Sequence, residues 1–455
     1  MKMKKLSLLL ASCLMVGSLA GCGSTDKEEP STGGDDTAVE KTVLKIAALE
    51  GGYGTEHWNK LEEAYEAENE NVDIELTIAP NLEEVIRPQI QAGNAPDLIY
   101  LGMGRPEALT ETFINEQALH DLSGVMGMTV PGEDVKVEDK ILDGFLDTSA
   151  TNPYGDATYL APIFYSPTGL FYNKALFAEK GYEFPTTWDE FFALGDQAKE
   201  EGIYLFTYPT SGYLDSMVPA MIAAAGGPEA FDSAMNYEEG FWTSDAATKV
   251  LETVAKLKDY IAPETVANAN SDGGFKNNQQ MILDNKALFC PNGTWLPGEM
   301  ADAPRADGFE WGFGAYPSFE TGADTYSLNF FEQMYIPAEA QNIEEAEKFM
   351  AYMYSDEAVA IIAEHGANAV IPVEGAIDIA GDFLDELSIE MLSVYDNGAK
   401  PIMGNFAAAE SVEGLDWKGI YVGTVDSIMN GTKTVADWQA DLTAASDKLR
   451  ANIIK

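Results

Sequence analysis

Three aromatic side chains stand beside turn residues, in segments where the sequence predicts loops. Trp295 follows an Asn-Gly-Thr turn at the end of a predicted strand, Trp417 lies in a polar segment, and Tyr213 follows a Ser-Gly pair. A flat aromatic face can stack on the C–H face of a sugar ring, and aromatic residues are enriched in ligand pockets. All three are therefore candidate ligand-binding residues. The alternative for each is an ordinary place in the hydrophobic core.

Two predicted loops combine glycines with polar side chains. Glu50 and Tyr53 flank a Gly-Gly pair directly after the first predicted strand, and Arg105 follows a Gly-Met-Gly segment after the third. Glycine lets the backbone approach a ligand closely, and a carboxylate such as that of Glu50 can accept hydrogen bonds from two hydroxyls. The simpler interpretation is a glycine turn with a surface cation nearby. We expect the three side chains to belong to a binding site.

A later strand, predicted over residues 326–336, also carries polar and aromatic side chains. Because successive side chains of a strand point to opposite faces, Phe330 and Glu332 share one face and Asn329 lies on the other. Only one of these faces can line a cleft, and we assign it to Phe330 and Glu332. Tyr165, earlier in the chain, is either a hinge residue or a binding residue.

Motifs of covalent, metal and nucleotide chemistry are missing from the sequence. The three histidines and three cysteines are far apart, without an HExxH or CxxC pair, and no GxSxG, P-loop or complete GxGxxG occurs. We therefore expect no catalytic residue, no bound metal and no cofactor. Glycoside hydrolysis needs only two suitably spaced carboxylates. A surface-anchored carbohydrate-active hydrolase or lyase is consequently the alternative that stays open.

Composition and charge limit the partners. The 455 residues include 27 Lys and Arg against 75 Asp and Glu, a formal net charge of -48. Proteins bind nucleic acid by neutralising phosphates with basic side chains, so a nucleic-acid partner is unfavourable. Such a charge favours a soluble monomer. A receptor for cations or polyamines is a further alternative that the acidic charge suggests.

The first 41 residues predict export and a tether. Residues 1–21 combine a basic start, an apolar run too short to span a bilayer, and a small-residue cleavage site. The segment Leu19–Cys22 resembles the lipobox of bacterial lipoproteins, which implies a signal peptide over 1–21 and a diacylglyceryl group on Cys22. Residues 22–41 lack a periodic apolar pattern and predict a flexible linker. We expect a protein anchored by lipid, with palmitate-type chains, on the outer face of the cytoplasmic membrane. A plain secretory signal is the alternative.

The rest of the chain reads as an α/β protein. Residues 42–49 and 72–78 have strand patterns around a helical stretch, and 97–101 follows as a third strand, which predicts a parallel sheet. Pro88 should kink or restart the second helix. Further strands are predicted over 203–207 and 286–290. About 410 residues exceed what one such core organises, so we expect two lobes.

Four later helices have recognisable starts. Capping pairs are predicted at Thr187 with Glu190, at Asn342 with Glu345 and at Thr434 with Asp437, and Ser244 opens another helix. The apolar side chains after each of them recur at helical spacing. In the first of these helices, Trp188 is expected in the core.

Six short motifs, in order along the chain, resemble the extracellular solute-binding proteins of bacterial carbohydrate ABC importers, the group of maltose-binding protein. They span nearly the whole chain behind the lipobox. The motifs are Gln91–Leu98 (QAGNAPDL), Tyr159–Pro162 with Gly169–Lys174, Pro185–Phe191 (PTTWDEF), Asn285–Leu288 with Asn292–Trp295, Ala346–Met350, and Ser355–Ala358. The segments 326–337 and around Trp417 look most similar to binding proteins for N-acetylglucosamine and chitin oligosaccharides.

The resemblance implies a fold: an α/β, two-lobed, type II periplasmic-binding-protein architecture with a hinged cleft. By this analogy the first lobe comprises residues 42–162 and 326–370, and the second comprises 163–325 and 371–455. The chain would cross between the lobes near Pro162, near Tyr326 and again around 367–372. The two lobes would close on a ligand held between them.

The resemblance also implies the function and three of the site residues. Trp295 occupies the position of a tryptophan that stacks on a sugar ring in the family, Trp417 that of another stacking aromatic, and Tyr213 that of an aromatic of the second lobe. It implies a mono- or oligosaccharide ligand, an ABC permease as partner, and no enzymatic step. The identity, length and linkage of the sugar do not follow from the sequence.

Overall fold

The computed structural model describes residues 41–105, 107–146, 148–155, 157–407 and 409–453. The predicted signal peptide, Cys22 and the linker up to residue 40 lie outside these residues. The described strands form a sheet in the order β2-β1-β3-β8-β4-β6-β5, with β7 beside β4 and β9 beside β8. Their bounds are β1 Thr42–Leu49, β2 Val72–Ala79, β3 Leu98–Tyr100, β4 Ala161–Asn173, β5 Tyr204–Phe206, β6 Ala287–Gly293, β7 Trp311–Gly314, β8 Thr325–Tyr335 and β9 Ala399–Ile402.

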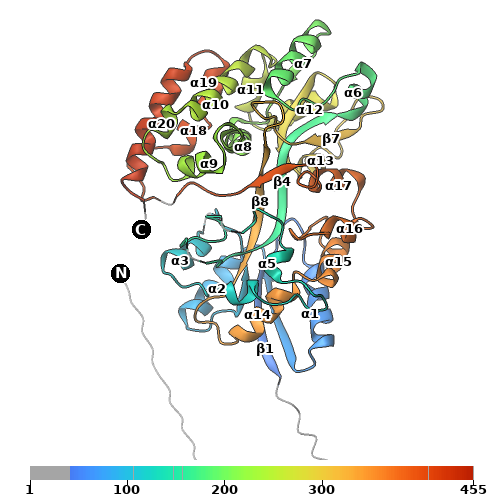
Figure 1. Cartoon of the computed structure of the whole chain (residues 1–455), viewed down its shortest axis with the longest axis vertical. Helices are drawn as coiled ribbons and strands as arrows, with labels where there is room; N and C mark the ends of the chain where they lie inside the picture. Colours follow the sequence, from blue (N-terminus) through green and yellow to red (C-terminus); the bar gives the residue numbers. More distant parts are fainter. Residues whose placement is uncertain (1–40, 106, 147, 156, 408, 454–455) are drawn as a thin grey trace, which may run out of the picture. The chain divides into compact units, whose positions relative to one another are not determined.

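Helices alternate with these strands along the chain (Figure 1). Before β4 they are α1 Glu56–Glu68, α2 Leu82–Gln91, α3 Leu109–Asn115, α4 Ser123–Met126 and α5 Val137–Lys140. Between β4 and β8 they are α6 Lys174–Lys180, α7 Trp188–Glu200, α8 Leu214–Gly226, α9 Pro228–Met235, α10 Asp245–Lys256, α11 Thr265–Ala269, α12 Phe275–Leu283 and α13 Leu296–Glu299. After β8 come α14 Ile343–Tyr352, α15 Asp356–His365, α16 Ala376–Ala380, α17 Glu386–Leu392, α18 Trp417–Tyr421, α19 Thr424–Met429 and α20 Val435–Arg450. Three one-turn 3-10 helices are Ser211–Tyr213, Phe241–Thr243 and Leu257–Asp259.

The predicted parallel start of the sheet is confirmed. β1 pairs in parallel with both β2 and β3, and helix α1 lies between the first two strands in sequence. The helical stripe Trp58, Leu61 and Tyr65 is buried, as its spacing indicates. Burying this stripe against the sheet brings the loops after β1 and β3 to the same edge, because parallel strands end on the same side.

Strands β4 and β8 pair antiparallel and run through two regions of the core. At one end, Ile163 of β4 and Met334 of β8 belong to a first hydrophobic core together with β1–β3. At the other end, Leu170 and Leu328 belong to a second core built from α7–α10 and α18–α20. The two strands therefore tie the cores together (Figure 1). Their middle segments are left between the cores.

The first core includes residues beyond 370, the predicted end of the first lobe. Val373, Ala376, Ala380 and Leu384 are buried in it, although they follow residue 370. Helix α16 therefore packs with the first core after the chain has passed the predicted third crossing. The lobe limits implied by the resemblance stay predictions.

Most of the predicted helix starts are confirmed, and one is wrong. Thr187 with Glu190 and Thr434 with Asp437 form capping boxes, and Ser244 caps α10. Asn342 does not cap α14, because its amide donates instead to the Val43 carbonyl over 2.9 Å. Pro88 does not restart the second helix, because α2 continues through it to Gln91. The missing N–H of the proline removes a single helical hydrogen bond.

Trp188 is buried with 3% of its surface exposed, as predicted. Cys290 is a free, buried thiol, and burial raises its pKa far above the ordinary value. Within the part of the chain that the structure describes, no helix combines the length and the apolar character needed to cross a bilayer.

Candidate functional site

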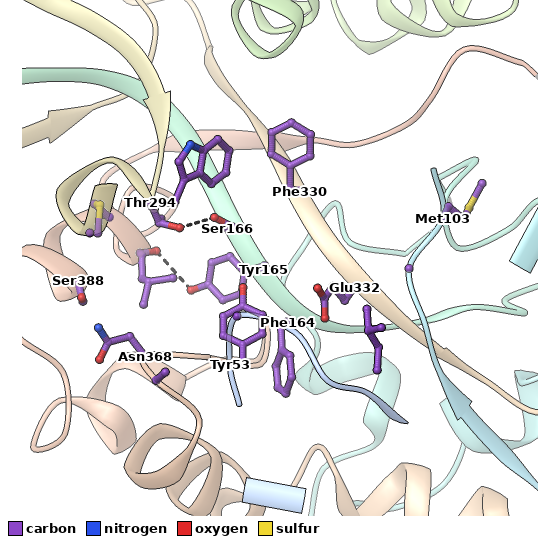
Figure 2. Close-up of a pocket in the computed structure, with 18 of the residues that line it drawn as sticks. Tyr53, Met103, Phe164, Tyr165, Ser166, Thr294, Phe330, Glu332, Asn368 and Ser388 are labelled. Carbon is purple, nitrogen blue, oxygen red and sulfur yellow. Dashed lines mark hydrogen bonds between the residues drawn. The ribbon is translucent and has the colours of Figure 1, made fainter. Parts of the chain in front are cut away.

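A cleft of about 690 Å³ lies where β4 and β8 pass between the two cores. The loops after β1 and β3 contribute to it, and so does the turn after β6. Figure 2 shows side chains from these elements converging on one space. The lining residues are Leu49, Gly52, Tyr53, Gly102, Met103, Arg105, Phe164, Tyr165, Ser166, Thr294, Trp295, Gly298, Phe330, Glu332, Ala367, Asn368, Ser388, Met391 and Leu392.

The cleft brings together six of the nine predicted binding residues, which are Tyr53, Arg105, Tyr165, Trp295, Phe330 and Glu332. They come from five separate segments of the chain, the outermost almost 280 residues apart. Glu50, Tyr213 and Trp417 are not part of the lining.

Two exposed aromatic side chains, Trp295 and Phe330, form one wall of the cleft. Trp295 is 38% exposed and Phe330 is 48% exposed, and their ring centroids lie 5.7 Å apart at 54°. A large aromatic side chain buries about 150–250 Å² when it is fully covered. Two such side chains that stay partly exposed in a concave site leave apolar surface that a ligand can cover. Their ring faces offer surface for an apolar patch on a ligand.

The position of the Trp295 ring depends on Gly293. Strand β6 ends at this glycine, and a Cβ atom added there would lie 2.2 Å from carbon atoms of the indole. The ring therefore lies directly over the glycine backbone. The Asn-Gly-Thr-Trp segment thus ends the strand with glycine, whose lack of a Cβ atom leaves room for the indole.

Alternation along β8 sorts its side chains between two sides. Phe330 and Glu332 line the cleft, while Asn329 and Gln333 lie on the other side of the strand, with 4% and 2% of their surfaces exposed. The face assigned to the cleft from the sequence is the face that lines it here. The hydrogen bonds of β8 with β4 hold both side chains in register, since Phe330 lies opposite Ser166.

Glu332 is the acidic group of the cleft, and it lies beside Tyr53 (Figure 2). Burial raises the pKa of Glu332 to about 7. Burial also raises the pKa of Tyr53 far above its ordinary value, and the charge of Glu332 adds to that shift. Near neutral pH the carboxyl is therefore poised between its two forms, one an acceptor only and the other also a donor.

Neutral hydroxyls from β4 and from the turn after β6 line the same space. The hydroxyls of Ser166 and Thr294 hydrogen bond to each other across the two segments (Figure 2). Tyr165 is 3% exposed, and its hydroxyl donates to the Leu392 carbonyl over 3.4 Å. Burial raises the pKa of Tyr165, with Asp396 adding to the shift. Tyr165 thus supports the cleft wall with its ring while its hydroxyl contacts α17.

Arg105 lines the cleft, but its guanidinium is held by a partner that the sequence prediction missed. It donates to both carboxylate oxygens of Glu83, from Nε over 2.7 Å and from NH2 over 3.2 Å. Glu83 is 2% exposed, and although its burial opposes ionisation, hydrogen bonds from Arg105 leave its pKa below the ordinary value. The pair fixes the loop after β3 against α2, so positioning this loop is the evident role of Arg105.

The three predicted residues outside the lining have other surroundings. Glu50 follows the end of β1 and is exposed. Trp417 begins α18 and stacks on Tyr421 with the ring planes 3° apart and the centroids 5.6 Å apart. Tyr213 is half-buried beside the cleft wall. Burial raises its pKa and the Trp295 indole acts against the rise.

The sequence prediction also missed Asn368 and Ser388. Asn368 and the preceding Ala367 both have positive φ, 68° and 46°, so two consecutive non-glycine residues adopt the left-handed conformation at the edge of the cleft. Such strain is concentrated at functional sites. Asn tolerates this conformation better than most residues, but that signal is too weak to locate a site from sequence. Ser388 lies on α17, whose place beside the cleft depends on contacts distant in sequence.

Among the described residues, no cluster of three or more His, Cys, Asp or Glu side chains is arranged to hold a metal ion. Within the described lining, Glu332 is the only Asp or Glu. The arrangement can therefore offer aromatic faces, hydroxyls, an amide and one carboxyl group to a ligand. This is the chemistry that a polyhydroxylated ring with apolar C–H faces requires.

Comparisons with known proteins identify a family. The family model described as bacterial extracellular solute-binding protein matches residues 51–360. The diacetylchitobiose binding protein NgcE of Streptomyces coelicolor is 28% identical over 300 residues, which are 62% of this chain and 59% of that protein. A multiple sugar-binding protein of Streptococcus mutans is 25% identical over 307 residues, 65% of this chain and 67% of that protein.

Solved structures show the same fold. The apo form of RafE from Streptococcus pneumoniae has a TM-score of 0.66 at 18% identity, covering 90% of this chain and 98% of that one. The bacterial solute receptor AcbH has a TM-score of 0.68 at 17% identity, covering 90% and 99%. The chain therefore has the two-lobed α/β fold of substrate-binding proteins, as the sequence predicted.

Proposed function

Because the chain belongs to the family of bacterial extracellular solute-binding proteins, we propose that it captures a sugar or oligosaccharide reversibly and delivers it to the permease of an ABC importer. The observation that carries this proposal is the pair of uncovered aromatic rings, Trp295 and Phe330, beside hydroxyl, amide and carboxyl groups in one cleft. Sugar recognition needs both kinds of surface at once.

The names of relatives support a carbohydrate as the solute. One relative binds diacetylchitobiose, another is a multiple sugar-binding protein, and RafE has been solved in complex with raffinose. The site residues proposed for contact with the sugar are Tyr53, Trp295, Phe330 and Glu332, with Tyr165 and Arg105 supporting the walls. Glu50, Tyr213 and Trp417, also predicted from the sequence, would reach the ligand only through a change in the cleft.

The mechanism follows from the position of the cleft between two cores. Lobes of residues 42–162 with 326–370 and 163–325 with 371–455 would both contact the sugar when they approach each other. A ligand that contacts both lobes only in the closed arrangement shifts the population toward it by its differential affinity. The closed, loaded protein would then dock on the permease as a monomer, and the sugar would leave unaltered.

A hydrolase is the weaker candidate for a structural reason. Glycoside hydrolysis ordinarily uses two carboxyl groups on either side of the scissile bond. Within the described lining of the cleft, Glu332 is the only Asp or Glu, so a second carboxyl group is missing there. The expected behaviour is therefore stoichiometric binding without product.

Isothermal calorimetry of the purified protein tests the function. The panel would pair N-acetylglucosamine with diacetylchitobiose, galactose with raffinose, and xylose with xylobiose. Saturable binding of at least one sugar, which chromatography recovers intact, is the expected result. Heat that continues with turnover, or new products, would establish the hydrolase instead. No binding to any sugar would reject the proposal.

Anchoring by lipid on Cys22 is part of the same proposal and has its own test. Cells grown with radioactive palmitate should label the protein in the membrane fraction. The Cys22→Ala variant should lose the label, and a labelled variant would contradict lipidation at this residue.

A further inference from the structure

The described lining of the cleft holds one acidic and one basic side chain, Glu332 and Arg105, and only the acidic one is free. The Arg105 guanidinium donates to both carboxylate oxygens of Glu83, so its charge is compensated within the protein. The carboxyl group of Glu332 has no hydrogen-bond or ion-pair partner among the described residues. The charge that the cleft offers to a ligand is therefore negative.

The Glu332 carboxyl group is open to the cleft. The residue keeps part of its surface, and neither of its carboxyl oxygens is among the fully covered unpaired atoms of the described structure. Figure 2 shows the group on the side of Tyr53, whose pKa the Glu332 charge helps to raise. A ligand in the cleft can thus reach the oxygen atoms directly.

An ionised Glu332 lacks a compensating positive charge in the described structure. Burial raises its pKa to about 7, which means that ionising this group costs free energy. The tyrosine hydroxyls of the lining, those of Tyr53 and Tyr165, stay neutral, because burial raises the pKa of each far above its ordinary value. A cation placed beside Glu332 would favour the ionised form, and a neutral hydroxyl would do so less.

Aromatic rings surround the space in front of this carboxyl group. The rings of Tyr53 and Phe164 lie 4.9 Å apart, edge to face, and those of Trp295 and Phe330 lie 5.7 Å apart. An ammonium group within about 6 Å of an aromatic face is attracted by the ring quadrupole, and proteins recognise ammonium ligands in aromatic cages. The cleft combines such rings with one free carboxyl group.

The spacing along β8 relates the stacking surface to the charge. Phe330 and Glu332 are two residues apart on one face of the strand, so their Cα atoms are separated by roughly 7 Å. A pyranose ring with one substituent spans a comparable distance. A sugar ring that stacks on Phe330 can therefore present a ring substituent to Glu332.

We propose that the sugar which this cleft prefers carries a free amino group, held as an ammonium ion by Glu332 while the sugar ring stacks on Phe330 and Trp295. This inference rests on the proposed function and deepens it, because it names the chemical class of the sugar. N-acetylation would remove the charge, and Glu332 would repel a sugar carboxylate. The net charge of -48 attracts cationic solutes to the protein as well.

The first test compares sugars that differ in the amino group. The purified protein is titrated calorimetrically with glucosamine and N-acetylglucosamine, with the glucosamine dimer and diacetylchitobiose, and with galactosamine and galactose. In at least one pair the amino form should bind about tenfold or more tightly, since hydrogen bonds between charged partners are the stronger ones. Glucuronic acid should bind more weakly than either form. Spermidine, an amine without a sugar ring, should also bind more weakly than the amino sugar.

The second test counts protons. At about pH 6.5 most of the Glu332 carboxyl group is protonated in the free protein, because its pKa is about 7. An ammonium group that binds there ionises it, so more than about half a proton should be released per amino sugar. Titrations in buffers with different ionisation enthalpies measure this number. The N-acetylated sugar should release fewer protons.

Glu332→Gln keeps the size of the side chain and removes its charge. In this variant the ratio of the two affinities, amino form over neutral form, should fall about tenfold, and the proton release should disappear. The matched control is Glu75→Gln, which removes one exposed carboxylate on β2 and should keep both properties. Thermal melts show whether each variant is folded, and the comparison of sugars on the parent protein does not depend on either variant.

The possible results distinguish the two proposals. Equal or tighter binding of the neutral form in every pair would overturn the preference for an amino sugar and leave the proposed function intact. Binding of the amino sugar without proton release, or an unchanged affinity ratio in Glu332→Gln, would do the same. Affinity for spermidine alone, or for none of the ligands, would contradict the proposed function itself, and this inference with it.

Discussion

The ring centroids of Trp295 and Phe330 lie 5.7 Å apart, although one side chain follows β6 and the other belongs to β8. Strand β4 lies between these two strands in the sheet, and its pairing with both sets the spacing of the rings. Both side chains are partly exposed, Trp295 at 38% and Phe330 at 48%. The pair therefore offers exposed aromatic surface on one side of the cleft.

Trp295→Ala should weaken sugar binding with little change in stability. The expected loss is about 1.5–3 kcal/mol, or roughly 10- to 150-fold in Kd, because a sugar ring loses a large aromatic contact. Trp295 is 38% exposed, so the fold gains little from it. Calorimetry with the recognised sugar and a thermal melt measure both effects. Unchanged affinity would remove Trp295 from the site.

Gly293→Ala should reproduce most of that loss without touching the indole chemically. A methyl group at this position would lie 2.2 Å from the Trp295 ring, so the ring must move from its place in the cleft wall. The expected effect is a tenfold or greater rise in Kd. Intrinsic fluorescence would report the displaced ring. Gly127→Ala, where a methyl group meets its nearest neighbour at 3.5 Å, is the control and should bind normally.

Glu332→Gln should change how stability depends on pH. Burial raises the pKa of Glu332 from its ordinary 4.5 to about 7, so the folded state favours the protonated form. The preference of the folded state for protonated Glu332 therefore stabilises the fold fully below pH 4.5. This contribution is lost as the pH rises through 7. The free energy of unfolding of Glu332→Gln is compared with that of the parent at both pH values. The difference should favour the variant by on the order of 2 kcal/mol more at pH 8 than at pH 4.5. Urea unfolding at the two pH values measures this.

The exposed Glu75→Gln is the control for that experiment and should leave the pH profile of the parent unchanged. The same variants address binding. If ionised Glu332 accepts hydroxyls from the sugar, affinity should rise between pH 6 and 8, since hydrogen bonds to a charged acceptor are the stronger ones. Glu332→Gln should abolish that rise. An affinity that falls over this range would show that the protonated carboxyl group acts as a donor instead.

Tyr65→Phe should destabilise the first core by about 1–3 kcal/mol, because the buried Glu345 carboxylate loses this hydrogen bond and keeps only the longer contact with Lys348, at 3.5 Å. The Tyr65 hydroxyl donates to Glu345 over 2.6 Å, which joins α1 to α14. Chemical denaturation gives the free energy of unfolding. Tyr204→Phe, at a tyrosine that is 37% exposed, serves as the control and should change stability by less than about 0.5 kcal/mol. Equal effects of both substitutions would contradict the assigned role of the hydrogen bond.

Local sequence signals located much of the site because they act over a few residues. The alternation that places Phe330 and Glu332 on one face follows from strand geometry alone. The glycines after β1 and the turn before Trp295 likewise mark strand ends from composition. For the same reason the capping boxes at Thr187 and Thr434 were predicted correctly.

Side chains whose partners are distant in sequence were predicted less well. Asn342 has the residue type of a cap, yet it binds Val43, almost 300 residues away. The guanidinium of Arg105 is engaged by Glu83, and Trp417 packs edge-on against Tyr237, a residue 180 positions earlier. Nothing in the residue types of these positions distinguishes a free side chain from an engaged one.

The sequence alone determined the α/β class, six of the nine described strands and the family resemblance, because periodicity, caps and turns are short-range physics and recur as motifs. Tertiary structure alone decided which polar atoms stay unpaired, such as Oδ1 of Asn329, and which aromatic rings stay uncovered. Those properties depend on the packing of segments that are brought together only when β4 and β8 join the two cores.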